Sequence, residues 1–120
     1  MSDYNLIERT SVFGEEIVRL CISMPKTVVT TPLISQLIRS GTSIGANYAE
    51  ADDAESKNDF RHKIGICKKE SVETKFFLRM LKVAIPEKLK EIEILQNEAT
   101  EFNLIFNAIF KKVKSSTLMK

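Results

Sequence analysis

The sequence is poor in the residues that break helices, form disulfides or build metal sites. Among its 120 residues are four glycines, three prolines, two cysteines, one histidine and no tryptophan. An all-β domain needs many turns, so this scarcity of glycine and proline argues against that class. Cys21 and Cys67 lie far apart, at apolar positions of helical patterns and without metal-ligand spacing. We interpret both as reduced core residues.

Long apolar runs are also missing, and so is a strong charge of one sign. No stretch approaches the roughly 18 uninterrupted apolar residues of a membrane span. The first residues lack the basic cluster and apolar run of a signal peptide. The net charge is only +2, so any binding of nucleic acid would depend on local clusters of cations. We expect one cytoplasmic domain, residues 1–120, without a membrane partner.

Apolar residues recur at helical spacing, and the three prolines divide the chain into segments. Thr31 is expected to cap a helix whose first residue is Pro32. Ser56 with Asp59 three residues later resembles a capping box at the start of another helix. The pattern predicts an all-α fold, an antiparallel up-down four-helix bundle. Its helices are expected at residues 5–24, 32–52, 57–84 and 87–114.

The expected core residues of three helices follow from this spacing. The first helix carries Leu6, Val12, Phe13, Ile17, Leu20, Cys21 and Met24. The third carries Phe60, Ile64, Cys67, Ser71, Thr74, Leu78 and Leu81, and the fourth carries Ile92, Leu95, Ala99, Phe102, Phe106, Ile109 and Val113. The last two sets alternate strictly by four and three residues. A period of 3.5 is typical of helices that cross at about 20°, so we expect these two to form an antiparallel hairpin.

The second predicted helix has a more polar inner side. Its expected inner positions are Leu33, Leu37, Ser40, Ile44, Asn47 and Ala51. Gly41 and Gly45 lie four residues apart on one face, and each lowers helix stability by about 1 kcal/mol relative to alanine. We therefore expect another backbone to lie close against these two glycines.

Apolar residues also occur outside the expected core positions of the last two helices. They are Phe76, Phe77, Met80, Leu104, Ile105 and Phe110. A helix that is apolar on nearly all sides is buried on more than one side. One interpretation is that the core faces are wide. The other, which we favour, is that this surface is the interface of a homo-oligomer.

Two polar segments resemble the signatures of a known family. Residues 39–51 read RSGTSIGANYAEA, and residues 56–63 with 70–81 read SKNDFRHK and ESVETKFFLRML. They resemble the four helix bundle protein family, first noticed as reading frames inside intervening sequences of bacterial large-subunit ribosomal RNA genes. The resemblance covers roughly residues 5–112. It implies a bundle that assembles as a homopentameric barrel. A distant relative is the accessory variability determinant of diversity-generating retroelements, which carries a basic surface and works with a reverse transcriptase.

Several residues of these segments are polar and lie in or beside the expected core. They are Arg39, Ser40, Ser43, Asn47, Glu70, Ser71, Glu73 and Thr74. A buried polar group without a hydrogen bond lowers stability by about 1–3 kcal/mol. We therefore predict a hydrogen-bonded structural network between helices, with Arg39 pairing with Glu70 or Glu73. The alternatives are a ligand or catalytic site and a polar interface between subunits.

Cations cluster in the third helix. Between Lys57 and Lys90, ten Lys/Arg residues face four Asp/Glu residues. Four of the cations recur every seven residues and therefore lie on one edge of the helix: Arg61, Lys68, Lys75 and Lys82. One interpretation is pairing with acids of a neighbouring helix, such as Glu91 and Glu98, or simple solvation. The other is contact with the phosphates of RNA or DNA, led by shape and charge rather than by base sequence. The candidates are Arg61, Lys68, Lys69, Lys75, Arg79 and Lys82.

No catalytic arrangement is recognisable. Asp59 and His62 resemble half of a di-iron site, but the sequence lacks the second Glu-x-x-His unit that such bundles need. We interpret this pair as charged residues at the start of a helix, and expect no catalytic residue, cofactor or metal. The favoured function is a non-enzymatic, homo-oligomeric accessory protein that binds nucleic acid. The alternative is a structural adaptor that recruits a protein partner without binding nucleic acid.

Overall fold

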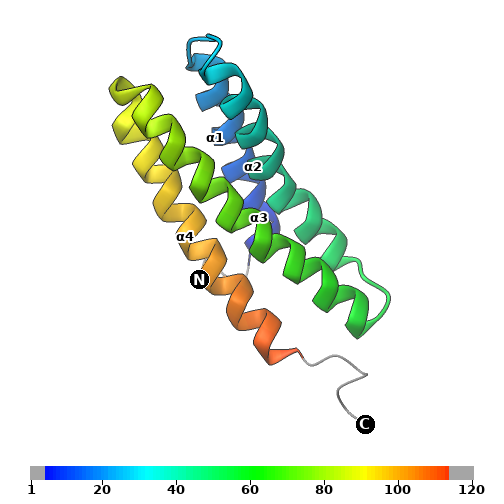
Figure 1. The fold of residues 1–120 in the computed structure, drawn as a ribbon. Helices are drawn as coiled ribbons and strands as arrows, with labels where there is room; N and C mark the ends of the chain where they lie inside the picture. The colour runs from blue at the N-terminus through cyan, green and yellow to red at the C-terminus, as the bar shows by residue number, and fades with distance from the viewer. Residues whose placement is uncertain (1–4, 114–120) are drawn as a thin grey trace.

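The computed structural model describes residues 5–113 as an all-α bundle, which confirms the predicted fold class (Figure 1). The helices are α1 (Leu6–Ser23), α2 (Thr30–Asp52), α3 (Lys57–Ala84) and α4 (Leu89–Lys112), with a 3₁₀ turn, η2 (Pro86–Lys88), before α4. Residue 114, the expected end of the last helix, lies outside the described residues. The molecule is elongated, with principal dimensions of 52 × 29 × 19 Å.

The second helix begins earlier than predicted because two threonines cap it together. The backbone N–H of Thr30 donates to the hydroxyl of Thr27 at 3.1 Å, and the N–H of Thr27 donates to the hydroxyl of Thr30 at 2.9 Å. This reciprocal pair is a capping box that uses threonine at both positions. The pair closes the turn directly before the regular helix, which starts at Thr30, and the prediction of Thr31 as the cap was wrong. The cap at Ser56 is confirmed, since its hydroxyl accepts from the N–H of Asp59 at 3.0 Å.

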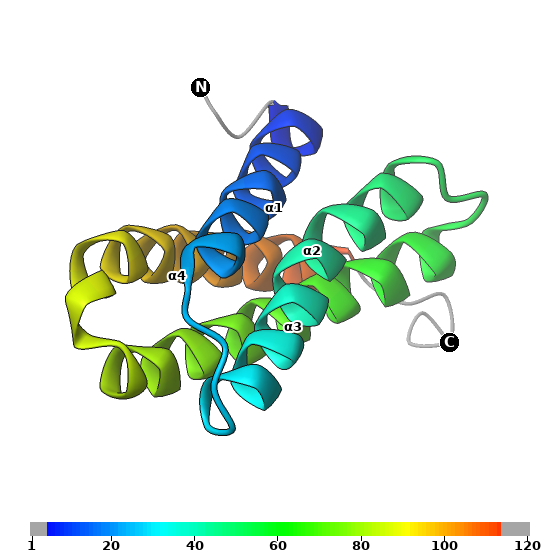
Figure 2. The ribbon, with the colours of Figure 1, turned by 90° about the horizontal axis from the view of Figure 1, so that it is seen from above.

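Adjacent helices run antiparallel along the chain. From Arg39 to Glu50 along α2, the partners on α3 run backwards from Glu70 to Lys63. The same reversal relates α3 to α4, because Lys82 meets Glu93 whereas Lys68 meets Phe110. Figure 2 views this arrangement from above, and α2 packs against both α1 and α3. Within residues 5–113, no helix combines the length and the apolar character needed to cross a membrane.

The core follows the predicted pattern closely in α3 and α4. All seven expected positions of α3 are buried except Phe60, which is half-buried. In α4 the expected positions are buried from Ile92 to Phe106, and the last two are half-buried. In α2, Leu33 and Asn47 are only half-buried, because the helix turns Ile34 inward against α1.

Gly41 and Gly45 allow the backbone of α2 to approach α1, as predicted. A Cβ atom at Gly45 would lie 3.2 Å from the backbone oxygen of Thr10. A Cβ atom at Gly41 would lie 2.9 Å from both γ-carbons of Ile17. Neither position has room for a side chain without movement of α1, so the loss of helix propensity is offset by close packing.

α1 meets α4 at a narrow joint. The rings of Phe13 and Phe102 lie 5.3 Å apart, edge to face. Beside them the guanidinium of Arg9 pairs with Glu98 at 2.8 Å. Val12 was predicted to be buried, but it is 41% exposed. The reason is that it lines a groove between α1 and α4, where the two helices do not close completely.

Candidate nucleic-acid interface

The predicted basic edge of α3 lies beside α4. Arg61 and Lys68 contact the ring of Phe110, and Nζ of Lys82 lies 3.6 Å from the carboxylate of Glu93. Lys75 belongs to the same seven-residue repeat, so helical periodicity places it on this edge as well. Its side chain is half-buried, whereas Arg79, further along α3, is exposed. The structure therefore brings these five cations to one side of the α3–α4 hairpin, which we call the α3–α4 face.

The acids that were expected to neutralise this face point elsewhere. Glu98 pairs with Arg9 of α1, and Glu91 pairs with Lys88 in the turn before α4. The interpretation that α3 pairs with these two acids was therefore wrong, although one cation of α3, Lys82, does pair with another acid of α4, Glu93. The reason is that Glu91 and Glu98 lie on the side of α4 that faces α1. In residues 5–113, neither Lys68 nor Lys75 has an acid within 4 Å.

The edge of α4 that faces Lys68 and Lys75 is polar but neutral from Gln96 to Asn107, whereas Glu93, closer to the start of α4, pairs with Lys82. Asn103 donates from Nδ2 to the backbone oxygen of Lys68 at 3.4 Å, which fixes this edge next to α3. Half-buried polar residues recur along it at intervals of four, three and four: Gln96, Thr100, Asn103 and Asn107. Sequence reasoning missed this set, although its spacing repeats the rhythm of the apolar core. Amides and hydroxyls beside cations can donate to phosphate oxygens without competing for the positive charge.

One end of the α3–α4 face is built around Phe110. The guanidinium of Arg61 lies 3.7 Å from the centre of the Phe110 ring and donates from Nε to the backbone oxygen of Val113 at 2.5 Å. It thereby satisfies a carbonyl at the end of α4 that has no helical partner. Nζ of Lys68 lies 4.8 Å from the same ring. A Cβ atom at Gly65 would lie 3.1 Å from this ring, so glycine lets Phe110 pack directly on α3.

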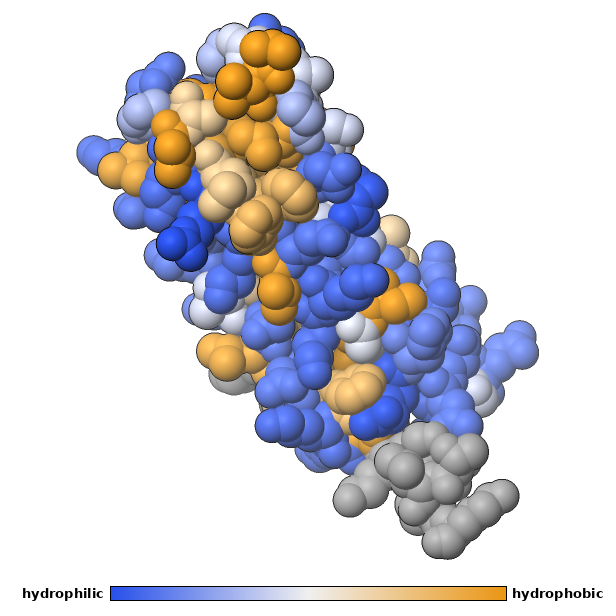
Figure 3. All heavy atoms as spheres, viewed as in Figure 1, coloured by the Kyte–Doolittle hydropathy of each residue, from blue (hydrophilic) through white to orange (hydrophobic). Residues whose placement is uncertain are grey.

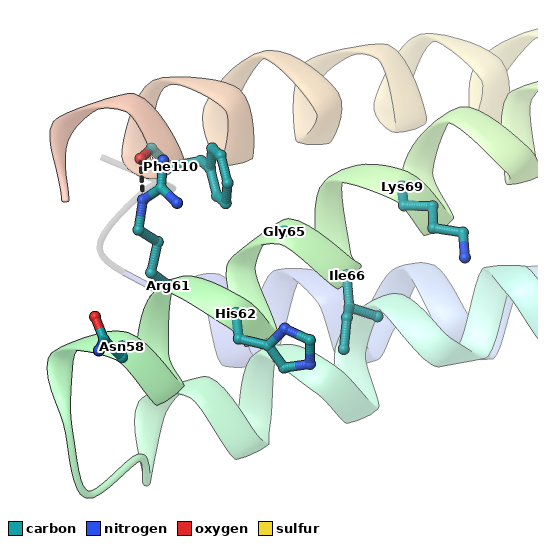
Figure 4. A pocket seen from close by; sticks show the side chains of 7 residues that line it. All are labelled: Asn58, Arg61, His62, Gly65, Ile66, Lys69 and Phe110. Atoms are coloured by element: carbon teal, nitrogen blue, oxygen red, sulfur yellow. Dashed lines mark hydrogen bonds between the residues drawn. The ribbon is translucent and has the colours of Figure 1, made fainter. Parts of the chain in front are cut away.

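A groove of about 460 Å³ opens beside this aromatic contact. Figure 4 shows Arg61 reaching to Phe110 on α4, while His62 and Lys69 point away from α4. The groove is lined by Asn58, Arg61, His62, Gly65, Ile66, Lys69 and Phe110. Arg61 already donates to the end of α4 and contacts Phe110, so it has a structural role in joining α3 to α4. Lys69 and His62 are exposed and bring hydrogen-bond donors to the groove.

The predicted oligomer residues divide into two groups. Phe77, Ile105 and Phe110 are half-buried against the core, as the interpretation of wide core faces predicts. Phe76 is 51% exposed and Leu104 is 63% exposed. The remaining candidate, Met80, is half-buried. Figure 3 shows apolar side chains gathered over the end of the molecule at which α3 ends, and mostly polar side chains over the other half of this face.

Fewer residues of the predicted polar network connect two helices than expected. Arg39 of α2 pairs with both Glu70 and Glu73 of α3, as predicted. The other predicted members bond within their own helix in the part of the chain that the structure describes. Ser40 approaches the carbonyl of Leu37, Asn47 donates to Ser43, Ser71 donates to the carbonyl of Cys67, and Thr74 donates to the carbonyl of Glu70. Short side chains in a helix reach their own preceding turn more easily than a neighbouring helix, so the network does not extend along the interface.

The two glutamates of this cluster differ in pKa. Burial raises the pKa of Glu70, although Arg39 opposes the shift. The hydrogen bond from Arg39 lowers the pKa of Glu73. A carboxyl group whose pKa is raised on folding contributes stability at low pH, and that contribution is lost as the pH rises through the raised pKa. The lowered pKa of Glu73 has the opposite effect on stability. Its contribution is present at higher pH and is lost on acidification.

We therefore expect Glu70→Gln to change how stability depends on pH. Relative to the natural protein, the variant should become progressively more stable as the pH rises above 4.5, the ordinary pKa of a glutamate, because glutamine has no charge to keep buried. Urea unfolding at several pH values measures the difference. Part of it arises at Glu73, because the hydrogen bond with Glu70 also helps to lower the pKa of Glu73. Glu87→Gln, at an exposed position, is the control. A stability difference between Glu70→Gln and the natural protein that is constant with pH would contradict the expectation.

Both cysteines are buried and reduced. Burial raises the pKa of Cys21 to about 11 and the pKa of Cys67 to about 12. At neutral pH each therefore stays a thiol rather than the thiolate that acts as a nucleophile. Among residues 5–113, no three His, Cys, Asp or Glu side chains are grouped in a way that could hold a metal ion.

Comparison with known proteins identifies a family and shows similarity to a solved structure. Residues 2–108 match the model of a family described as 23S rRNA-intervening sequence protein. The chain is also similar to a crystal structure of a protein of unknown function from the S23 ribosomal protein family, from Bacteroides thetaiotaomicron. The two chains share 34% identity and a TM-score of 0.75, over 88% of this chain and 98% of the other. No curated protein matches the sequence.

Proposed function

Because this chain belongs to the family of 23S rRNA-intervening sequence proteins, we propose that it is a non-enzymatic, homo-oligomeric accessory protein of the cytoplasm. It binds RNA or DNA through the α3–α4 face. One observation carries the proposal: in the described residues, Lys68 and Lys75 lack acidic partners, and the facing edge of α4 is neutral around Asn103. If acids of α4 lay beside these lysines, the lysines would form structural salt bridges within the protein instead of facing a ligand.

The chemistry of this face favours phosphates over bases. Lysine side chains release condensed counterions when they approach phosphates, which gives affinity without sequence preference. The ring of Phe110 already contacts Arg61 and Lys68, so a base that stacked on this ring would compete with these two cations. A net charge of +2 is small for one chain, but a symmetric assembly repeats the face in every subunit. Repeated weak sites on one long polyanion bind with high combined affinity.

Binding of labelled structured RNA and duplex DNA at two salt concentrations tests this function. At about 50 mM salt we expect binding that weakens steeply toward about 200 mM salt. Lys68→Glu/Lys75→Glu should weaken binding roughly 10- to 100-fold and reduce the salt slope by about two, since each phosphate contact contributes about 0.9. The matched control is Arg19→Glu/Lys90→Glu, which makes the same change in net charge at exposed positions of α1 and α4.

Two results would overturn the proposal. The first is no binding at low salt by the natural protein, which would leave the structural adaptor as the function. The second is an equal loss of binding in the control, which would assign the effect to net charge rather than to the α3–α4 face. Circular dichroism and the measured mass of each variant establish that the fold and the assembly are unchanged.

A further inference from the structure

The polar edge of α4 carries oxygen atoms that can accept hydrogen bonds from a ligand. The hydroxyl of Thr100 donates its hydrogen to the backbone oxygen of Gln96 at 2.9 Å, so toward a ligand the hydroxyl oxygen can only accept. Asn103 donates from Nδ2 to the backbone oxygen of Lys68. Because that backbone oxygen can only accept, the other end of this amide is the oxygen Oδ1, which is also an acceptor.

The amides at the two ends of this edge have no partner within residues 5–113. There the side chains of Gln96 and Asn107 form no hydrogen bond, and no side-chain nitrogen or oxygen is buried without one. Solvent therefore reaches the amide atoms of both residues. Each amide has an oxygen that accepts and a nitrogen that donates. At 1.5 Å per residue, the row is about 17 Å long, and we call it the α4 polar row: Gln96, Thr100, Asn103 and Asn107.

Two lysines of α3 lie beside the α4 polar row. Lys82 lies next to Glu93, and Lys68 lies next to Asn103. Lys75 is midway between these two lysines along α3, so antiparallel packing places it beside the first half of the row. Lys68 and Lys75 are about 10 Å apart along the helix axis, at 1.5 Å per residue. A ligand on the α3–α4 face therefore meets two positive charges next to a row of neutral acceptors.

This combination fits RNA better than DNA in its hydrogen bonds. A phosphodiester has acceptor oxygens and no donor, so it suits the lysines but offers nothing to the oxygen of Thr100. The 2′-hydroxyl of ribose can donate as well as accept, and deoxyribose lacks this group. An acceptor row beside lysines is therefore complementary to a sugar–phosphate backbone that carries 2′-hydroxyls.

The shape of the face also fits an RNA duplex. The face is made of two adjacent helices, each about 10–12 Å across with its side chains. The minor groove of B-form DNA is only about 6 Å wide, so two helices side by side cannot enter it. The minor groove of an A-form RNA duplex is wide and shallow and displays 2′-hydroxyls next to the phosphates. A broad face can lie across such a groove without entering it deeply.

We propose that the α3–α4 face selects duplex RNA over duplex DNA, because Thr100 and Asn103 accept hydrogen bonds from 2′-hydroxyls while Lys68 and Lys75 bind the neighbouring phosphates. The inference rests on the proposed function, since it names the nucleic acid that this same face binds. It adds specificity-determining residues to that function. Lysines alone bind the phosphates of RNA and DNA alike.

Three duplexes of one sequence test which ligand the face selects: RNA, DNA and 2′-fluoro RNA. The 2′-fluoro duplex keeps the A-form but has no 2′-hydroxyl that can donate. Fluorescence anisotropy at about 50 mM salt, where phosphate contacts are strong, measures each dissociation constant. RNA should bind roughly 10-fold more tightly than either of the other duplexes, because two neutral hydrogen bonds are lost with each. Equal affinity for RNA and 2′-fluoro RNA would overturn the inference.

Variants without the two acceptors test the residues. Thr100→Val/Asn103→Leu leaves the net charge unchanged, so it should weaken RNA binding roughly 10-fold and leave DNA binding and the salt slope as they are. Lys68→Glu/Lys75→Glu should instead weaken the binding of both duplexes. Thr100→Ser keeps the hydroxyl and should keep the preference for RNA. Circular dichroism establishes that each variant is folded.

The matched control is Thr42→Val/Asn97→Leu. The hydroxyl of Thr42 donates to the carbonyl of Ile38 four residues earlier, as that of Thr100 does within α4, and Asn97 lies on the side of α4 that faces α1. This variant should bind RNA like the natural protein.

The inference is overturned if Thr100→Val/Asn103→Leu binds RNA as tightly as the natural protein, or if it loses RNA and DNA binding equally. Equal binding of RNA and DNA by the natural protein would overturn this inference and leave the proposed function intact. No binding of any duplex at low salt would overturn both, so the two failures are distinguishable.

Discussion

Replacement of Phe102 by alanine is expected to lower the free energy of unfolding by about 3–5 kcal/mol. Phe102 has no exposed surface. Its ring meets Phe13 edge to face at 5.3 Å and stacks with Phe106 at 6.1 Å, and the guanidinium of Arg9 lies 5.1 Å from its centre. Aromatic pairs of this kind contribute about 0.5–1.5 kcal/mol beyond simple burial. Because α1 touches α4 mainly at this joint, the variant should also loosen α1.

Urea unfolding followed by circular dichroism measures the change, and hydrogen exchange of α1 amides reports the loosening. Leu104→Ala is the control, because the side chain is 63% exposed and such substitutions usually change stability by less than about 0.5 kcal/mol. A loss below about 1 kcal/mol for Phe102→Ala would mean that α1 and α4 are held together by contacts other than the aromatic joint.

The sequence predicted the α3–α4 hairpin well because two helices with strict 3.5-residue spacing have one continuous face to bury. The break at Pro86 and the cap at Ser56 were also predicted correctly, because each depends only on residues next to it in the sequence. It failed at Val12, because burial there depends on how far α1 lies from α4, which no pattern within α1 encodes. It also failed at Thr27 and Thr30, since two threonines in place of the usual Ser/Thr and Glu/Gln pair gave a weak capping signal.

The sequence predicted which cations form the candidate site, but it did not predict which residues of α4 lie beside them. The seven-residue repeat from Arg61 placed the cations on one edge of α3, and the structure shows that edge beside α4. Which residues of α4 would face this edge was not predicted, although the neutral polar residues of α4 follow the rhythm of its buried core residues. The ion pair between Arg9 and Glu98 turns one acid away and leaves Asn103 facing α3.

The second large effect is expected where α1 and α2 approach each other. Gly41→Leu should lower the free energy of unfolding by about 3 kcal/mol, because even its Cβ would lie 2.9 Å from two carbons of Ile17. Gly41→Ala should be destabilising by a smaller amount, since a gain of about 1 kcal/mol in helix propensity opposes the clash. Gly14→Ala is the matched control in the same interface. Its Cβ would have no contact closer than 3.8 Å, so this variant should keep or raise stability.

A double-mutant cycle separates close packing from a general effect of glycine. Ile17→Ala alone should lower the free energy of unfolding by about 2–5 kcal/mol, because it leaves a cavity beside Gly41. The same change removes the carbons that a new side chain at residue 41 would strike. Gly41→Leu/Ile17→Ala should therefore be less destabilised than the sum of its two single variants, by about 1 kcal/mol or more. Strict additivity in urea unfolding would show that residue 41 does not contact Ile17 and that α1 lies further from α2.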